Sequence, residues 1–335
     1  MIAHDSDSGY QPSQGVIVEW YYYDEKWTAE QVTLAHSRVE ELAQRFSVND
    51  KPTNLRVFDC IGYIRHPKKN DQALLYKVPV STYTDKILGQ PVTLFEILSP
   101  GKVSTGLKQT VSLENRFRLA ALLATSILEL HNVNWLHKNL NSYNLLFFTD
   151  GDGNISFTEP YITGFDFSRP DRPGQKSLTM RPSLWDIYRH PDVLKVTPSS
   201  QQLQSYQRKY DVFSLGLILF EIGLWRRLDG FTKPNLTSQA FQTRIETYVE
   251  RDMSLWMGDT YKRVVQKCLS GDYLQDPDTI ALDVEITAKP AIAEKSDHAD
   301  VSGETENARE LSGFYRHVVA ELGRCQCGVA NGQLL

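Results

Sequence analysis

The pattern of apolar and polar positions in the first ninety residues alternates between strand and helix. Gly15–Tyr23 is a run of β-branched and aromatic residues, which is typical of a strand. Thr28–Phe46 repeats apolar residues at helical spacing and predicts an amphipathic helix. Leu55–Tyr63 and Ala73–Val78 then predict two strands around a polar turn. Residues 1–15, rich in Ser, Asp, Gly and Gln, are expected to be a flexible N-terminus.

Beyond Pro91 the pattern becomes mainly helical. Leu113–Leu130 gathers its leucines on one face and predicts a helix. Leu145–Phe148 predicts a strand, and the turn-forming stretch Asp150–Asn154 would close it into a hairpin. Tyr206–Trp225 is apolar over most of its length and predicts a long buried helix. The chain is therefore expected to be an α+β protein whose second part is mostly helical.

The C-terminal sequence predicts one irregular segment followed by one helix. Residues 275–305 are rich in Asp, Glu, Ala, Pro and Ser, so we expect a solvated, flexible insertion there. Residues 306–323 predict a closing helix, and residues 326–335 are expected to be a tail.

Composition narrows the classes of function. The chain has 335 residues, of which 41% are hydrophobic and 23% charged, and this is ordinary globular composition. A net charge of -5 argues against nucleic acid as a partner, because phosphate recognition needs a basic face. Four cysteines without a histidine pair at ligand spacing indicate free thiols in a reducing compartment.

Targeting signals are not apparent in the sequence. The N-terminus lacks the charged and apolar regions of a signal peptide. The most apolar run, residues 215–225, contains Glu221 and is far shorter than the ~20 residues that span a bilayer. We expect a soluble, cytoplasmic protein that does not insert into a membrane.

The segment from Trp135 to Phe148 carries the most informative motif. It resembles the catalytic loop of protein kinases, in which His-Arg-Asp is followed after four residues by Asn. Here His137, the basic residue Lys138 and the final Asn144 are present, but Asn139 stands where a kinase has its catalytic aspartate. An amide is not basic near neutral pH, so Asn139 is able to orient a hydroxyl but not to deprotonate it.

Three further motifs follow in the order that a kinase requires. Within Gly164–Arg169, the residues Asp166-Phe167-Ser168 resemble the Asp-Phe-Gly turn that binds metal, with serine in place of its glycine. His190-Pro191-Asp192 lies where the activation segment of a kinase closes with Ala-Pro-Glu, which implies a structural role for Asp192. Asp211, in the sequence Asp-Val-Phe-Ser-Leu-Gly, matches the start of the large buried helix. We expect Asp211 to be buried and to accept hydrogen bonds from the backbone near His137.

This resemblance implies a two-lobed protein-kinase-like fold. Its small β-rich N-lobe would comprise residues 16–90, truncated at the glycine-rich loop, and its large α-helical C-lobe residues 91–325. Asn144 and Asp166 would be the oxygen ligands that hold Mg²⁺ against the phosphates of ATP. A second interpretation stays open, in which these two residues only fix the loops through hydrogen bonds.

The small lobe departs from an active kinase. The resemblance aligns Tyr21 with the lysine that contacts the ATP phosphates, and a phenol is neutral at pH 7. Glu40 or Glu41 would then be the helix glutamate that has lost its lysine partner. Residues 8–15 do not match the glycine-rich loop, and too little chain precedes Gly15 for two full strands. Binding of ATP and Mg²⁺ is accordingly expected to be weak or absent.

The same motifs also resemble a fungal group, the kinase-like C-terminal domains attached to HeLo-type (prion-inhibition and propagation) proteins. This resemblance covers roughly residues 16–325. It implies action in fungal non-self recognition and regulated cell death. The membrane-active helical domain of those proteins is not part of this sequence, so membrane activity is not carried over.

Three functions remain open from the sequence. The favoured one is a pseudokinase that acts through protein partners as a signalling or interaction module. The second is an atypical Ser/Thr kinase that binds ATP and Mg²⁺ through Asn144 and Asp166 and transfers phosphate slowly. The third is a metabolite sensor that uses the former nucleotide cleft. Ser177 and Thr179, between Asp166 and Pro191, are candidate phosphorylation sites.

Overall fold

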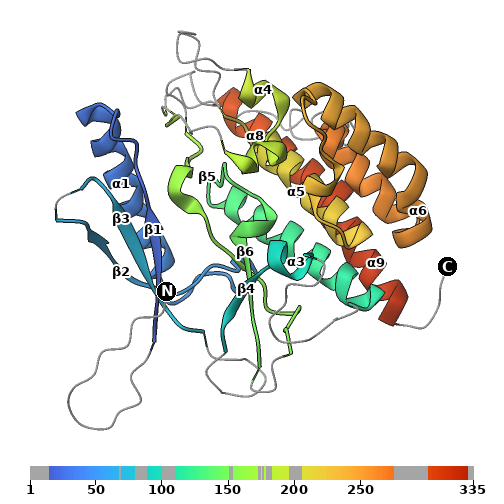
Figure 1. Cartoon of the computed structure of the whole chain (residues 1–335), viewed down its shortest axis with the longest axis horizontal. Coiled ribbons are helices and arrows are strands. Elements are labelled where there is room, and N and C mark those ends of the chain that lie inside the picture. The colour runs from blue at the N-terminus through green and yellow to red at the C-terminus, as the bar shows by residue number, and fades with distance from the viewer. Residues whose placement is uncertain are drawn as a thin grey trace, which may run out of the picture.

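Two groups of elements make up the structure, a computed structural model of mixed α+β class (Figure 1). A small antiparallel sheet with one helix is formed by the N-terminal residues, and the remaining elements form a larger, mainly helical group. The structure describes residues 15–67, 69–79, 89–99, 111–150, 154–172, 175, 177–178, 183–195, 206–274 and 301–330.

The N-terminal sheet has the strand order β1-β3-β2, formed by β1 (Val16–Tyr21), β2 (Cys60–Arg65) and β3 (Gln72–Lys77). Helix α1 (Ala29–Phe46) packs on β2 and β3, and a capping box between Thr28 and Gln31 fixes its first turn. The predicted succession of strand, helix, strand and strand is confirmed.

One predicted strand boundary in this sheet is wrong. The strand expected at Leu55–Tyr63 begins only at Cys60. Thr53–Leu55 instead forms a 3-10 turn, and the next residue, Arg56, has a left-handed backbone with φ 54°. That backbone turns the chain before it can enter the sheet.

Two small sheets bring the sequence motifs together. Strands β4 (Pro91–Thr93), β6 (Leu145–Phe148) and β7 (Tyr161–Ile162) pair in the order β4-β6-β7. Strand β5 (Trp135–Leu136) pairs with β8 (Arg169–Pro170). The loop between β5 and β6 therefore lies beside the turn between β7 and β8, so that residues 137–144 meet residues 163–168.

The larger group is built around a buried helix. Nearly every residue of α5 (Arg208–Leu224) is buried, because α3 (Leu113–Asn132) and α6 (Ser238–Ser270) pack against it (Figure 1). The long segment α6 is two helices that meet at Gly258, where φ is 79°. The other α-helices among the described residues of this group are α2 (Leu94–Ile97), α4 (Pro191–Leu194), α8 (Val301–Phe314) and α9 (Ala320–Ala330). A π-helical turn, Tyr315–Val319, joins α8 to α9.

The predicted C-terminal boundaries need correction. Helix α8 already begins at Val301, so residues 301–305 are helical and do not belong to the expected insertion. Helix α9 extends to Ala330 and takes up the first half of the expected tail. Residues 275–300 and 331–335, like the N-terminus up to residue 14, lie outside the described residues. No helix among the described residues combines the length and apolarity needed to span a bilayer.

Candidate functional site

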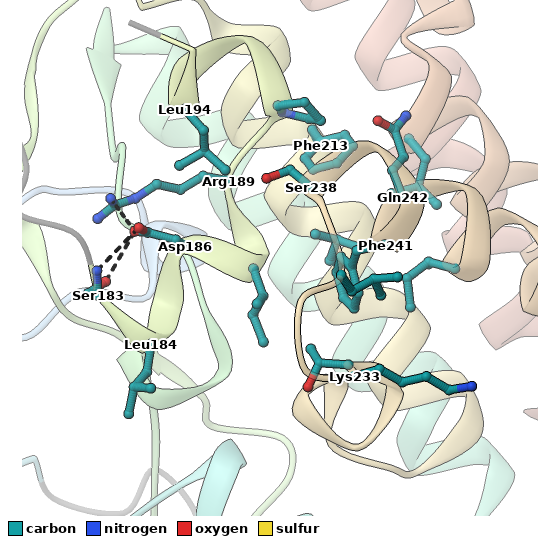
Figure 2. Close-up of a pocket in the computed structure, with 17 residues that line it drawn as sticks. Ser183, Leu184, Asp186, Arg189, Leu194, Phe213, Lys233, Ser238, Phe241 and Gln242 are labelled. Atoms are coloured by element: carbon teal, nitrogen blue, oxygen red, sulfur yellow. Dashed lines mark hydrogen bonds and ion pairs between the residues drawn. The ribbon is translucent and has the colours of Figure 1, made fainter. Parts of the chain in front are cut away.

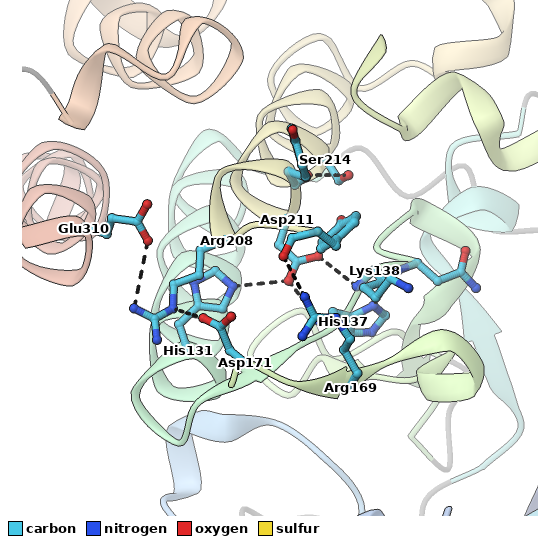
Figure 3. A network of polar contacts seen from close by, with 12 residues as sticks. His131, His137, Lys138, Arg169, Asp171, Arg208, Asp211, Ser214 and Glu310 are labelled. Atoms are coloured by element: carbon cyan, nitrogen blue, oxygen red, sulfur yellow. Dashed lines mark hydrogen bonds and ion pairs between the residues drawn. The ribbon is translucent and has the colours of Figure 1, made fainter. Parts of the chain in front are cut away.

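The carboxylate of Asp211 fastens the loop of His137 to helix α5 (Figure 3). Asp211 is fully buried and accepts backbone N–H bonds from His137 and Lys138, both at 2.8 Å. The hydroxyl of Tyr206 (2.9 Å) and Nε2 of His131 (3.2 Å) also contact this carboxylate. Burial alone would raise the pKa of Asp211, but the contacts with His131 and the other donors lower it below its ordinary value. The position and bonding predicted for Asp211 are confirmed.

His137 is a neutral anchor inside the loop. Its Nε2 lies 2.9 Å from the carbonyl oxygen of Thr163, and its Nδ1 accepts the backbone N–H of Asn139 at 3.2 Å. Burial lowers the pKa of His137 to about 4 despite the nearby charge of Asp211. The ring therefore carries its proton on Nε2 and ties the loop to the end of β7.

Asn139 lies between the two predicted magnesium ligands. Its Nδ2 donates to Oδ1 of Asp166 at 3.1 Å. Its backbone oxygen accepts Nδ2 of Asn144 at 2.8 Å. The structure thus brings Asn139, Asn144 and Asp166 together, as the sequence predicted, and Asn139 uses its amide as a donor.

Gly164 makes this close approach possible. Its φ of 83° lies in the left-handed region, which favours glycine. A Cβ at this position would lie 2.0 Å from Nδ2 of Asn144. The amide of Asn144 therefore packs directly on the backbone in front of Asp166, and a side chain at position 164 would displace it.

Glu19 is a site residue that the sequence reasoning missed. It projects from β1 toward the turn of Asp166, where its carboxylate accepts the backbone N–H of Gly164 at 2.5 Å. The hydroxyls of Tyr76 (2.8 Å) and Tyr21 (3.1 Å) donate to the other oxygen. Burial raises the pKa of Glu19 in spite of these donors. The carboxylate of Glu19 thereby joins the N-terminal sheet to the turn of Asp166.

The carboxylates of Glu19 and Asp166 consequently lie near each other in one half-buried region. Burial, and next to it the charge of Glu19, raise the pKa of Asp166 to about 7, although the bond from Asn139 opposes this shift. Mg²⁺ needs oxygen ligands, and Asp166 and Asn144 supply two. Within the described part of the chain, no group of three or more His, Cys, Asp or Glu side chains is arranged to hold a metal. Water or a bound phosphate would have to complete the coordination.

Tyr21 and the helix glutamates lie apart from one another. Tyr21 is buried on the inner face of β1, where its hydroxyl binds Glu19. Glu40 pairs with Arg65, and Glu41 pairs with Arg45 at 2.9 Å and more loosely with Arg172. In the described residues no contact joins Glu40 or Glu41 to Tyr21, and both glutamates pair with arginines.

Lys138 is a buried lysine directly beside the Asp211 anchor. Its backbone has φ 69°, and its ammonium lies 5.4 Å from the centre of the Tyr206 ring. Burial first, and then the charges of Arg38 and Arg169, lower the pKa of Lys138 to about 7. This side chain packs inside the protein, and its ammonium is partly neutral at physiological pH.

The closing segment of residues 183–195 is anchored differently from the expectation. Asp192 is half-exposed and pairs with Lys195 (2.9 Å) and His190 (3.6 Å) within its own turn. The buried anchor is instead Tyr188, whose hydroxyl donates to Glu221 of α5 at 2.8 Å and lies 2.7 Å from Oγ of Ser142. Only the apolar run around Glu221 could have signalled this contact, because a lone acid in such a run needs a partner.

Of the two candidate phosphorylation sites, the structure describes one. Ser177 is half-buried, and its Oγ is enclosed without a hydrogen-bond partner among the described residues. Thr179 lies outside the described residues.

A separate cavity of about 320 Å³ lies under the same closing segment (Figure 2). Its walls come from the 3-10 turn Leu184–Tyr188, from α5 and from the start of α6, and they are mostly apolar. At its edge Asp186 binds Ser183 and Arg189. The cavity shares no lining residue with the cluster of Asn139, Asn144 and Asp166.

In a comparison with known protein families, residues 65–279 match the family described as 'domain of unknown function (DUF7580)'. A search of curated proteins finds no match. The matched segment includes the loop of His137, the turn of Asp166 and the whole of helix α5.

Proposed function

The chain belongs to the DUF7580 family, and we propose that this member is a pseudokinase that serves as a signalling or interaction module. In the proposal the N-terminal sheet with α1 corresponds to the small lobe of a kinase, and the helical group to the large lobe. Support comes from four motifs in kinase order and from the bonds between Asp211 and the loop of His137.

The contact between Asn139 and Asp166 carries the proposal. A kinase needs a proton acceptor at the position of Asn139, and here the side chain donates its N–H to Asp166. Loss of a general base typically costs 10²–10⁴ in rate, which is about 3–5 kcal/mol of barrier. With typical kinase turnover of about 1–100 per second, little transfer would remain.

Glu19 argues against nucleotide in the same direction. A kinase places a lysine on this strand to attract the ATP phosphates. Here β1 directs a carboxylate toward the backbone of Gly164, close to a second carboxylate, Asp166. Neither carboxylate supplies the positive charge that attracts phosphate, and to the extent that they are ionised they repel it unless a cation neutralises them.

One observation favours the rival function of an atypical Ser/Thr kinase. Asn144 and Asp166 both contact Asn139, so the two magnesium ligands of a kinase lie near each other. Mg²⁺ bound there would offset the negative charge and allow weak ATP binding. This rival predicts transfer that depends on Asp166.

Two measurements distinguish the proposal from its rival. Radiolabel transfer from ATP to a generic protein substrate is expected to stay at background in the wild type and in Asp166→Ala alike. ATP, with or without Mg²⁺, is expected to leave the melting temperature unchanged, whereas a ligand at a hundred times its Kd would add about 2.7 kcal/mol of stability. Transfer that disappears in Asp166→Ala would overturn the pseudokinase and establish the atypical kinase.

The partners of such a module would be proteins. The resemblance to the kinase-like domains of HeLo-type proteins suggests a role in fungal non-self recognition or regulated cell death. In that setting the domain would act by binding protein partners and not by transferring phosphate to them.

A further inference from the structure

Strand β1 is an open edge of the N-terminal sheet. In the strand order β1-β3-β2 it has one neighbour, β3, among the described residues. An edge strand exposes a row of N–H and C=O groups that another strand is able to pair with, and proteins usually block it with Pro, Lys or a bulge. Val16–Tyr21 contains none of these. Its one charge, Glu19, points inward, which is a further way to protect an edge, but hydrogen bonds from Gly164, Tyr21 and Tyr76 satisfy this carboxylate within its own chain.

The opposite edge, β2, is protected. A bulge interrupts its pairing between Cys60 and Gly62, and the backbone of Gly62 has φ 152°. A charged residue, Arg65, ends the strand and pairs with Glu40 of α1. The sheet therefore offers only one edge for pairing among the described residues.

The outer face next to the open edge is largely apolar, with one exposed charged residue, Lys77, at its end. The register aligns Val18 with Leu75 and Trp20 with Ala73, and Ile64 of β2 lies on the other side of Ala73. Trp20 is 36% exposed and Ile64 is 40% exposed. The solvated face of an antiparallel sheet is normally polar, so this face favours contact with another protein surface.

These features define the strand that would fit the edge. It must be extended, with apolar side chains on the outer face, and it must tolerate Glu19 on the inner face. β1 itself meets these conditions. We propose that two copies of this chain associate by antiparallel pairing of β1 with β1 about a two-fold axis.

The side-chain pattern selects one register for this pairing. Side chains alternate between the two faces of a strand, so a shift of one residue would put outer-face residues of one copy opposite inner-face residues of the other. Half of the possible registers are excluded for this reason. An axis at Glu19 would oppose two carboxylates, which destabilises a sheet. An axis at Val18 instead sets Val18 against Val18, Val16 against Trp20, and Ile17 against Glu19. A β-branched residue beside an aromatic one is a favourable cross-strand pair.

The association would stop at two chains. Pairing of identical edges about a two-fold axis is closed, and it uses the open edge of each sheet. The protected edge at β2 does not continue the array. The proposal is independent of what the loop of Asn139 does, because the outer face of β1 points away from that loop.

The first test measures mass in solution by sedimentation or light scattering over a range of protein concentrations. The wild type is expected to approach twice its mass of 38.2 kDa as concentration rises. Val18→Lys would set two ammonium groups against each other at the axis, and is expected to weaken association at least tenfold. Ile64→Lys makes the same change on the same face but on the other edge strand, and is expected to leave association unchanged.

Each alternative result has a defined meaning. A monomer at all concentrations, or a dimer that Val18→Lys does not weaken, overturns the proposal. Equal weakening by Val18→Lys and Ile64→Lys also overturns it, because that result would mean contact between sheet faces and not between edges. Circular dichroism spectra confirm that both variants remain folded.

A second variant tests the register without relying on a destabilising charge. Val18→Cys puts two thiols opposite each other at the axis, so mild oxidation is expected to give a disulfide-linked dimer. Ile64→Cys and the wild type, which carry the same native cysteines, are expected to remain uncross-linked. Absence of the cross-link in Val18→Cys, or its equal appearance in Ile64→Cys, contradicts the proposed register.

Discussion

At the level of single residues, the carboxylate of Asp211 is the contact on which the site depends most. Four donors from His137, Lys138, Tyr206 and His131 meet it in a region without solvent. Asp192 has the same charge but lies half-exposed and pairs within its own turn. The two aspartates therefore form a natural comparison.

Replacing Asp211 with alanine is expected to destabilise the protein by about 3–5 kcal/mol, because several buried donors lose their only strong acceptor. The melting temperature should fall by at least about 5 °C. Asp192→Ala is expected to change stability by less than about 1 kcal/mol. Denaturant or thermal unfolding measures both variants, and similar losses in the two would contradict the anchoring role of Asp211.

Gly164 offers a second test at this scale. Gly164→Ala would force alanine into a left-handed backbone, at about 1–2 kcal/mol, and its Cβ would collide with Asn144. We expect a clear loss of stability. Gly230→Ala is the matched control, because nothing lies within 4 Å of a Cβ there. If the two variants unfold alike, Asn144 does not pack on Gly164 as described.

Sequence reasoning succeeded at residues with one dominant role. Asp211 and His137 were found because the resemblance to kinase motifs assigned one structural role to each of them. Glu19 was missed because alternation in a strand puts Glu19 and Tyr21 on the same face without saying which one reaches a loop 145 residues away. Glu40 and Glu41 were assigned to the site by their position on the helix. In the structure each pairs with an arginine, and the sequence pattern did not indicate which arginines lie near them.

At the level of elements, the buried contact between the closing segment and α5 has a titration of its own. Glu221 is buried, accepts Tyr188 and the backbone N–H of Leu228, and has its pKa raised by burial to about 8. In the unfolded chain its pKa is near 4.5. At any pH between about 4.5 and 8, Glu221 therefore carries a proton in the folded protein and has lost it in the unfolded chain.

Glu221→Gln is consequently expected to make the protein less sensitive to pH. A raised pKa contributes stability that is full below about pH 4.5 and is lost as the pH rises through about 8. The variant lacks this loss, so its free energy of unfolding relative to wild type should rise from pH 5 to pH 8. Glu25→Gln, on an exposed residue, is the matched control for the change from carboxyl to amide. A constant difference between Glu221→Gln and wild type would refute a protonated Glu221.

Elements were predicted well where their pattern was strong. The strand Leu145–Phe148 and the helix beginning at Thr28 agree with the structure. No element was assigned to Ser238–Ser270, although its buried residues recur every four positions from Phe241 to Met257. The stripe is narrow, and the exposed Leu255 and Trp256 obscure it.

At the level of the whole molecule, the last helices complete the core begun by α3. Helix α9 and the π-helical turn pack against α3, and Leu322 and Val318 are fully buried. Phe314 at the end of α8 lies beside His131 of α3 and Tyr273. The segment most distant in sequence thus covers the face of an early helix.

This arrangement has a consequence for how the chain is made. While the chain is being synthesised, α3 emerges long before α9, so the part of α3 that α9 covers stays exposed until α9 has left the ribosome. An intermediate with this part of α3 uncovered would expose apolar surface and therefore be prone to aggregation. A nonsense mutation or a proteolytic cut before Val301 would make this transient state permanent.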